Sequence, residues 1–162
     1  MNLFELRSLH PGKPAPATEG EDLDGKPMKL SDYRGKAVML VFWASWCGPC
    51  MAAIPHEREL AKRYAGRPFA IVGVSGDGDR AAGQRAVVNA EISWRSFWNG
   101  PENGRGPIVN TWNVHAWPAV YLIDAGGVIR HRWLFRQRDI DRAVEQLVID
   151  AERAQHPPST RP

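Results

Sequence analysis

The sequence predicts an α/β fold, a three-layer α/β/α sandwich with an N-terminal hairpin and a central insert. Uninterrupted apolar runs at residues 37–44 and 69–74 are typical of strands that are covered on both faces. The elements follow the order β-α-β-α, then a hairpin and a closing helix, and helices that cross between strands imply parallel pairing. A chain of 162 residues is long enough to bury such a core without disulfide bonds.

The first part of the chain leads into the sheet. Residues 1–17 are proline-rich at their end and predict a lead-in segment rather than a core element. Asp24-Gly25 is a turn signal and predicts a hairpin. Ser31-Asp32 predicts a brief helical turn, which ends before the first buried strand at residues 37–44.

Two helices alternate with the next strands. The first helix is expected over residues 49–64, with Pro55 inside it as a source of a kink. Residues 69–74 form the second buried strand. A second helix is expected over residues 79–90, where Asp79 is a suitable N-cap. Residues 75–80 lack the Gly-Lys-Ser/Thr of a phosphate loop and the final Glu of an EF-hand, so they predict a strand-to-helix turn.

The second half adds shorter elements. A strand is expected at residues 93–98 and a loop at 99–107, which holds three glycines and two prolines. A short helical turn follows at residues 108–112. Two strands at residues 119–123 and 128–134 form a hairpin.

The last helix is expected to begin near Asp139, because apolar residues recur on one face at Ile140, Val144, Leu147 and Ala151. The residues after it, 156–162, contain Pro157 and predict a disordered tail. The redox domain discussed below is therefore expected to span residues 18–155.

Composition narrows the function classes. Hydrophobic residues make up 43% and charged residues 24% of the chain, as in ordinary soluble globular proteins. The net charge of +3 is mild and the basic residues are scattered among acids, so we expect no nucleic-acid partner. Residues 1–10 include Glu5 and Arg7 and lack the apolar core of a signal peptide.

The sequence Trp46-Cys47-Gly48-Pro49-Cys50 contains the only two cysteines of the chain. A lone Cys-x-x-Cys between a buried strand and a helix start is typical of a redox dithiol. A zinc site would need four ligands, and no second such pair exists, so we expect no metal. The helix N-terminus favours a thiolate at Cys47, and the thiolate is the attacking species in disulfide exchange. Because the dithiol carries the electrons, no cofactor is expected.

These residues resemble the thioredoxin superfamily. The similarity includes residues 41–50, Pro55 after the second cysteine, and Trp117-Pro118 at the start of a strand. The chain is most similar to the TlpA/ResA-like thiol-disulfide oxidoreductases, which are grouped with AhpC/TSA-type redoxins. This similarity includes the segment 30–36, the insert around residues 75–112 and the turn at 125–129, and it covers roughly residues 12–154.

The resemblance implies roles for the site residues. Cys47 would be the exposed nucleophile and Cys50 the buried resolving thiol. Pro118 would follow a cis peptide bond, which turns the backbone of Trp117 toward the cysteines so that an extended substrate can pair with it. The residues expected to bind substrate are Trp46, Gly48, Pro49, Trp117 and Pro118.

The seven tryptophans divide into three groups, one of which, Trp94, Trp98 and Trp112, is expected to pack the insert. Trp46 and Trp117 flank the cysteines and are candidates for an apolar platform under a substrate loop. Trp43 and Trp133 are expected to lie in the core.

The sequence departs from the family at its proton acceptors. Thioredoxins carry an acid where this chain has Val41, and ResA-like proteins often carry one where it has Ala53. Glu57 lies seven residues after Cys50, on the same helix face, and is a candidate proton relay. Two routes stay open: a water-bridged transfer from Cys50 to Glu57, or resolution with no dedicated base.

The expected activity is disulfide reduction or exchange by the dithiol. A thioredoxin-like peroxidase is the first alternative, but its usual Pro-x-x-x-Thr/Ser-x-x-Cys pattern is absent before both cysteines. A redox-interaction module of a larger protein is the second. We expect a protein or small-molecule disulfide as substrate, an upstream dithiol as electron donor, and a monomer. An extracytoplasmic location, with an export signal or anchor outside this sequence, is favoured over the cytoplasm.

Overall fold

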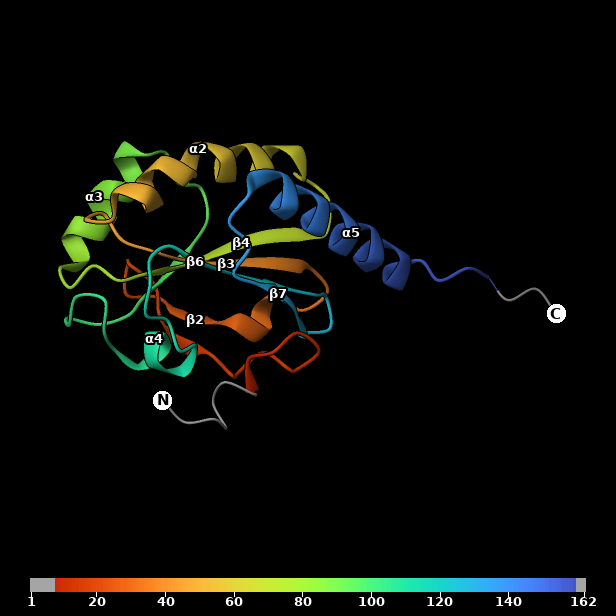
Figure 1. Cartoon of the computed structure of the whole chain (residues 1–162), viewed down its shortest axis with the longest axis horizontal. Helices are drawn as coiled ribbons and strands as arrows, with labels where there is room; N and C mark the ends of the chain where they lie inside the picture. Colours follow the sequence, from red (N-terminus) through yellow and green to blue (C-terminus); the bar gives the residue numbers. More distant parts are fainter. Residues whose placement is uncertain (1–7, 160–162) are drawn as a thin grey trace.

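The computed structural model describes residues 8–159, and a five-stranded sheet lies at its centre (Figure 1). The strand order is β5-β4-β3-β6-β7. Strands β3, β4 and β5 pair in parallel, whereas β6 and β7 pair antiparallel to their neighbours. The strands are β3 (Ala37–Trp43), β4 (Phe69–Ser75), β5 (Ser96–Trp98), β6 (Ala119–Ile123) and β7 (Ile129–Arg132).

Helices cover both faces of this sheet, which confirms the predicted α/β/α sandwich. Figure 1 shows α2, α3 and α5 above the sheet and α4 below it. The lower layer also contains a two-stranded antiparallel sheet and a 3-10 turn, as the hairpin signal predicted. The bounds are β1 (Glu19–Glu21), β2 (Pro27–Lys29), η1 (Leu30–Tyr33), α2 (Gly48–Arg63), α3 (Arg80–Asn89), α4 (Pro107–Thr111) and α5 (Gln137–Gln155).

Strand β3 separates two apolar cores. All seven of its residues are buried, because helices or loops cover both of its faces. Met39 and Val41 belong to the core under α2 and α5, whereas Leu40 and Phe42 belong to the core that contains Trp112 of the lower layer. The continuous apolar run therefore reflects a strand with no solvent-exposed face.

Three predicted boundaries differ from the structure by two residues or more. Strand β5 begins at Ser96 rather than residue 93, because the N–H of Ile92 still bonds to the carbonyl of Val87 at the end of α3. Strand β7 ends at Arg132, because Trp133 adopts a φ of 59°, in the left-handed region that breaks an extended strand. Helix α5 begins at Gln137, two residues before the predicted start.

Trp133 corrects a second expectation, since it was expected in the core. Its side chain is 54% exposed, because the left-handed backbone takes it out of the strand pattern. The guanidinium carbon of Arg132 lies 4.1 Å from the centre of its ring.

The lead-in segment is part of the fold, contrary to the expectation that it holds no core element. Leu9 is buried in the lower core. The N–H of Gly12 donates to the carbonyl of Ile129 at 2.7 Å, and the N–H of Ile129 donates to the carbonyl of Lys13 at 2.9 Å. At the other edge of the sheet, Asp22 forms a bridge with Phe97 of β5. The remaining predicted lead-in and tail residues, 1–7 and 160–162, lie outside the described residues.

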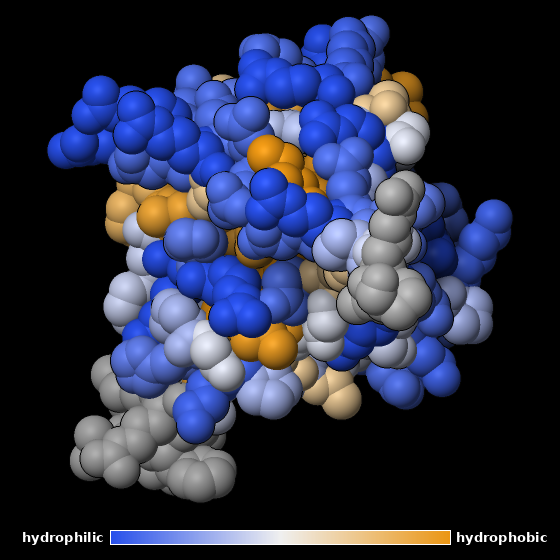
Figure 2. Space-filling model, turned by 90° about the vertical axis from the view of Figure 1, so that its right-hand side faces the viewer, coloured by the Kyte–Doolittle hydropathy of each residue, from blue (hydrophilic) through white to orange (hydrophobic). Residues whose placement is uncertain are grey.

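The surface remote from the start of α2 is mostly hydrophilic. Figure 2 shows this end of the molecule, with small apolar areas separated by polar side chains. Over residues 8–159, none of the helices combines the length and the apolar character that crossing a bilayer requires.

Candidate active site

The two cysteines lie at the junction between the end of β3 and the start of α2. Cys47 is the N-cap residue of this helix, and its sulfur accepts a hydrogen bond from the N–H of Cys50 at 3.2 Å. Pro49 lies in the first turn, where its fixed φ suits a helix start and its missing N–H costs nothing. The local sequence thus begins the helix at Gly48 and directs the free N–H groups of its first turn toward the sulfur of Cys47.

Cys47 and Cys50 form a disulfide, with their Cα atoms 5.2 Å apart. Cys47 is 5% exposed and Cys50 is 2% exposed. The expectation of an exposed Cys47 is therefore wrong for the disulfide form, because the sulfur is held against the helix end and bonded to Cys50. Exposure at the site comes from the neighbours Trp46, Gly48 and Pro49.

The peptide bond between Trp117 and Pro118 is cis, which confirms the prediction. The Trp117 ring meets the Trp46 ring at a centroid distance of 5.5 Å and an angle of 65°. The structure therefore brings these two predicted platform residues together. A glycine makes this arrangement possible, because a Cβ atom on Gly76 would lie 2.6 Å from the Trp117 ring. Gly104 lies next to both rings and has a φ of 65°, in the left-handed region that favours glycine.

Asp77 is a buried carboxylate that the sequence did not single out. Its oxygens accept hydrogen bonds from the N–H of Ser45 at 3.0 Å, from the Ser45 hydroxyl, and from the Ser75 hydroxyl at 3.0 Å. Its carbonyl accepts from the indole N–H of Trp98 at 2.7 Å. This network ties the end of β4 to the loop that carries Cys47.

Glu57 shares the buried face of α2 with Cys50, as predicted, but it is far less accessible than a surface acid. Its side chain is 4% exposed. Burial alone raises the pKa of this carboxyl to about 7. Among residues 8–159 it has no hydrogen-bond or ion-pair partner. Glu57 and Ala53 line a cavity of about 540 Å³ that also borders Pro118.

No cluster of three or more metal-binding side chains occurs among the described residues. The Cys47–Cys50 disulfide gives this site the chemistry of a dithiol and disulfide pair, and Trp46, Trp117 and the cis peptide bond before Pro118 belong to the same site.

Comparison with known proteins places the chain. A model of the AhpC/TSA family matches residues 11–132. The chain belongs to the AhpC/TSA family. Within it the chain is similar to proteins named thiol-disulfide oxidoreductase ResA, which supports a TlpA/ResA-like redoxin.

Two ResA relatives and one solved structure illustrate this membership of the AhpC/TSA family. The protein of Bacillus thuringiensis is 33% identical over 118 residues, which cover 73% of this chain but only 66% of the relative. That of Geobacillus thermodenitrificans is 30% identical, with coverage of 80% and 72%. The thioredoxin domain of a thiol-disulfide oxidoreductase from Bacteroides vulgatus superposes with a TM-score of 0.77 at 27% identity, covering 87% of this chain and 99% of that domain.

Loss of the Asp77 carboxylate should loosen the site of this AhpC/TSA member. Asp77→Ala leaves the buried donors of Ser45 and Ser75 unpaired, so we expect the free energy of unfolding to fall by about 2–3 kcal/mol. We also expect dithiothreitol to reduce the Cys47–Cys50 disulfide at an altered rate. Urea denaturation and stopped-flow fluorescence measure the two effects.

Asp79→Ala is the matched control. Asp79 caps α3 through the N–H of Ala81 at 3.0 Å and lies at the surface, so its loss should cost about 1 kcal/mol. It should leave the disulfide rate unchanged. Equal effects of the two variants on that rate would contradict a positioning role for Asp77.

Glu57 should make stability fall as pH rises. The native carboxyl keeps its proton up to about pH 7, whereas in the unfolded chain its pKa has the ordinary glutamate value of 4.5. The native state therefore binds more protons between these values, and the free energy of unfolding decreases across that window by about 3 kcal/mol. Glu57→Gln should remove this slope, and Glu59→Gln, an exposed neighbour, should keep it. Urea titrations at pH 4 to 8 test this, and identical slopes in wild type and Glu57→Gln would refute it.

Proposed function

We propose that the protein is a thiol-disulfide oxidoreductase that reduces or exchanges protein disulfides through Cys47 and Cys50. The observation that carries this proposal is the Cys47–Cys50 disulfide at the N-terminus of α2, whose neighbour Trp46 contacts Trp117 of the cis Trp117–Pro118 peptide. The names of its relatives, thiol-disulfide oxidoreductase ResA, support the same activity.

Cys47 is the attacking thiolate in this proposal. Its sulfur accepts the N–H of Cys50 and faces the positive end of α2, and both features favour the charged form. The thiolate attacks one sulfur of the substrate disulfide, forms a mixed disulfide, and expels the other substrate sulfur as a thiolate. Cys50 then attacks the Cys47 sulfur, which restores the Cys47–Cys50 disulfide and releases the second substrate thiol. Two electrons pass from the dithiol to the substrate.

The substrate lies along the surface around Cys47. Trp46 is 51% exposed, and Gly48 and Pro49 are also exposed, so these residues can contact a substrate segment that reaches the disulfide. The backbone of Trp117, set by the cis bond to Pro118, offers hydrogen-bonding groups to an extended segment.

The resolving step needs Cys50 to lose a proton. We propose that no side chain serves as a dedicated base, and that solvent or the departing substrate thiolate accepts it. The other route, a proton relay through Glu57, would need a bridging water, because Glu57 lies two helical turns from Cys50, about 10 Å along the axis. A fall in turnover for every substrate in Glu57→Gln would favour the relay.

The remaining expectations follow from the same proposal. The substrate is a protein or small-molecule disulfide, and a separate dithiol donor reduces the enzyme again. The protein acts as a monomer, binds no nucleic acid, uses no cofactor, and works outside the cytoplasm, exported or tethered. The similarity to ResA thiol-disulfide oxidoreductases supports the disulfide substrate and the location outside the cytoplasm.

An insulin assay tests the activity directly. With dithiothreitol as donor, the protein should accelerate insulin reduction well above the rate of dithiothreitol alone. Hydrogen peroxide should oxidise the reduced protein no faster than an ordinary thiol, since the peroxidatic pattern is absent. Rapid peroxide turnover would identify a peroxidase, and inactivity in both assays would indicate a redox-interaction module. A reduction potential of about −270 mV for the Cys47–Cys50 pair would indicate a reductant, and one of about −120 mV would indicate an oxidant.

A further inference from the structure

A cavity of about 540 Å³ opens at Pro118, beside the surface proposed to hold the substrate. Its walls come from α2, β3, the segment before β6 and β6 itself, and from residues 133–140 up to the first turn of α5. Apolar side chains dominate these walls, among them Met39, Val120 and Ile140. Pro118 belongs to both sites. It lines the cavity, and it follows the cis peptide bond of Trp117, whose backbone is proposed to pair with the substrate. A substrate segment that passes Pro118 can therefore place a side chain in the cavity.

Glu57 supplies the only carboxylate among the described residues that line this cavity. The other ionisable lining groups already have partners. The Nε2 atom of His56 lies 2.6 Å from Asp141, that of His115 lies 2.6 Å from Asn113, and the hydroxyl of Tyr121 donates to the carbonyl of Trp112 at 2.9 Å.

The Glu57 side chain is more than nine-tenths buried, and its oxygens have no hydrogen-bond partner within the described chain. They are not fully sealed from solvent, since no side-chain oxygen among the described residues is both fully buried and unpartnered, and Glu57 lines the cavity. Ionising a carboxyl in such surroundings is costly unless a partner is supplied. A cationic group that enters the cavity would supply the missing hydrogen bonds.

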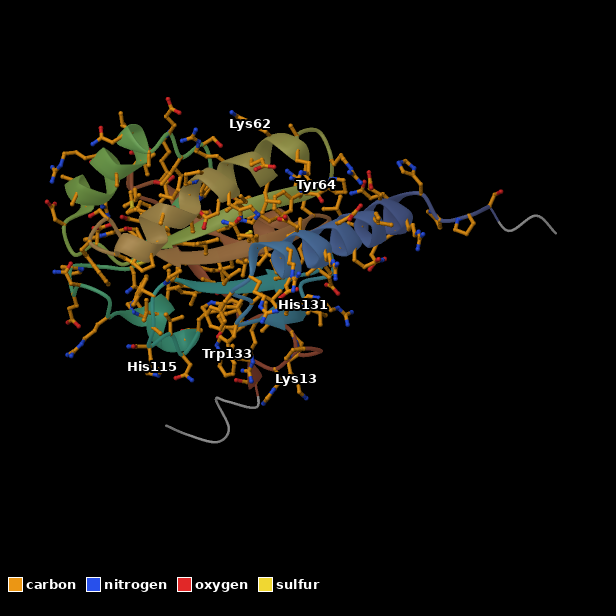
Figure 3. The ribbon with its side chains drawn as sticks, turned by 45° about the horizontal axis from the view of Figure 1, so that its top comes forward. Lys13, Lys62, Tyr64, His115, His131 and Trp133 are labelled. Carbon is orange, nitrogen blue, oxygen red and sulfur yellow. A yellow bond between two sulfur atoms is a disulfide. The ribbon has the colours of Figure 1, made fainter. Side chains whose placement is uncertain are left out.

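The rim of the cavity is unusually apolar for a surface. Trp133 is 54% exposed and Phe135 is 81% exposed, and both line the opening. Figure 3 labels Trp133 and His115, which lie on the same, lower side of that view. Exposed apolar side chains that adjoin a pocket are typical of a binding surface.

The matching ligand has an apolar stem and one cationic end. A lysine side chain combines four methylene groups with an ammonium that carries three donors. An arginine would bring five donors to a cavity with one free carboxylate, and several would stay unsatisfied. We propose that the cavity binds the side chain of a lysine in the disulfide substrate, with the Glu57 carboxylate holding its ammonium group. This inference rests on the proposed oxidoreductase function and specifies its substrate.

The proposal gives the selectivity a pH dependence. Only the ionised carboxylate attracts the ammonium, and the pKa of Glu57 is raised to about 7. Preference for lysine should therefore increase from pH 6 to pH 8. His56, His115 and Tyr121 also face the cavity, and Asp141 lies behind His56.

Peptide substrates test the proposal. Each peptide holds one internal disulfide and a single lysine placed at successive positions beside it, and a matched peptide carries norleucine, which keeps the stem but lacks the ammonium. At pH 8 we expect one lysine position to raise kcat/KM by about tenfold over norleucine. Glu57→Gln should abolish this preference, whereas Glu59→Gln, on the exposed side of the same helix, should retain it. A preference that survives in Glu57→Gln, or the absence of any preferred position, would overturn the proposal.

A binding measurement separates this inference from the activity itself. n-Butylammonium, which has the four carbons and the ammonium of a lysine side chain, should shift amide NMR signals of cavity residues in wild type at pH 8, and n-butanol should not. Glu57→Gln should weaken that binding about tenfold. Binding of the amine without reduction of any peptide would support the cation site in the cavity and refute the oxidoreductase function. Peptide reduction with no lysine preference and no amine binding would support the oxidoreductase function and refute the lysine site in the cavity.

Discussion

Cys47→Ser should lower disulfide reduction to the uncatalysed rate, whereas Cys50→Ser should trap a mixed disulfide with the substrate. Cys47 caps α2 and accepts the N–H of Cys50, so it holds the position of the attacking thiolate. Cys50 is the more buried of the two and lies one turn into the helix, where it can attack only the Cys47 sulfur. Without Cys50 the mixed disulfide has no resolving thiol.

Mass spectrometry after incubation of the reduced variants with a disulfide peptide measures this outcome. Cys50→Ser should gain the mass of one peptide, attached through a mixed disulfide at Cys47, and dithiothreitol should remove it. Cys47→Ser should gain no adduct. An adduct on Cys47→Ser and none on Cys50→Ser would reverse the two roles.

Trp112→Ala should lower the free energy of unfolding by about 3–5 kcal/mol, the largest stability effect that we expect. Trp112 is fully buried, and its ring packs 4.7 Å from the ring of Tyr121 and 6.3 Å from that of Phe42. Its indole N–H donates to the Thr18 hydroxyl at 3.0 Å. The substitution leaves a cavity and removes the bond that ties the lower layer to the segment before β1.

Trp133→Ala is the control for residue type, since the same side chain is lost from an exposed position. Its cost should stay below about 1 kcal/mol. Urea denaturation of both variants measures the difference. Similar midpoints for Trp112→Ala and Trp133→Ala would show that the lower core contributes little to stability.

The sheet and the redox pair could be predicted because each depends on local pattern. Strand β3 is apolar throughout since both of its faces are buried, and the Cys-x-x-Cys motif carries its chemistry within four residues. The cis bond before Pro118 came from resemblance rather than from pattern. The close contact of Trp46 with Trp117 depends on Gly76, which only the folded chain brings to the Trp117 ring.

Other features depend on contacts between distant parts of the chain. Asp77 meets Ser45 because β3 and β4 pair in parallel with Trp43 opposite Ser75, and the two residues are 32 positions apart. A Ser two residues before the first cysteine and an Asp two residues after a buried strand are the signals that could have suggested this. Helical spacing placed Glu57 on the Cys50 face, but its burial requires the segments that close the cavity. The exposure of Trp133 follows from one backbone torsion, which apolar patterning does not specify.

The N-terminal segments prevent the central sheet from growing. The unpaired N–H and C=O groups of an edge strand are a template for another chain, and proteins that leave them open tend to aggregate. Here residues 12 to 15 bond to residues 127–129 at the start of β7 at one edge, and Asp22 and Leu23 bond to β5 at the other. A chain cleaved before Asp24 would keep both cysteines but lose the segments that cover the two sheet edges. Such a fragment should form strand-paired aggregates, so the integrity of this region governs solubility as much as any residue near the disulfide.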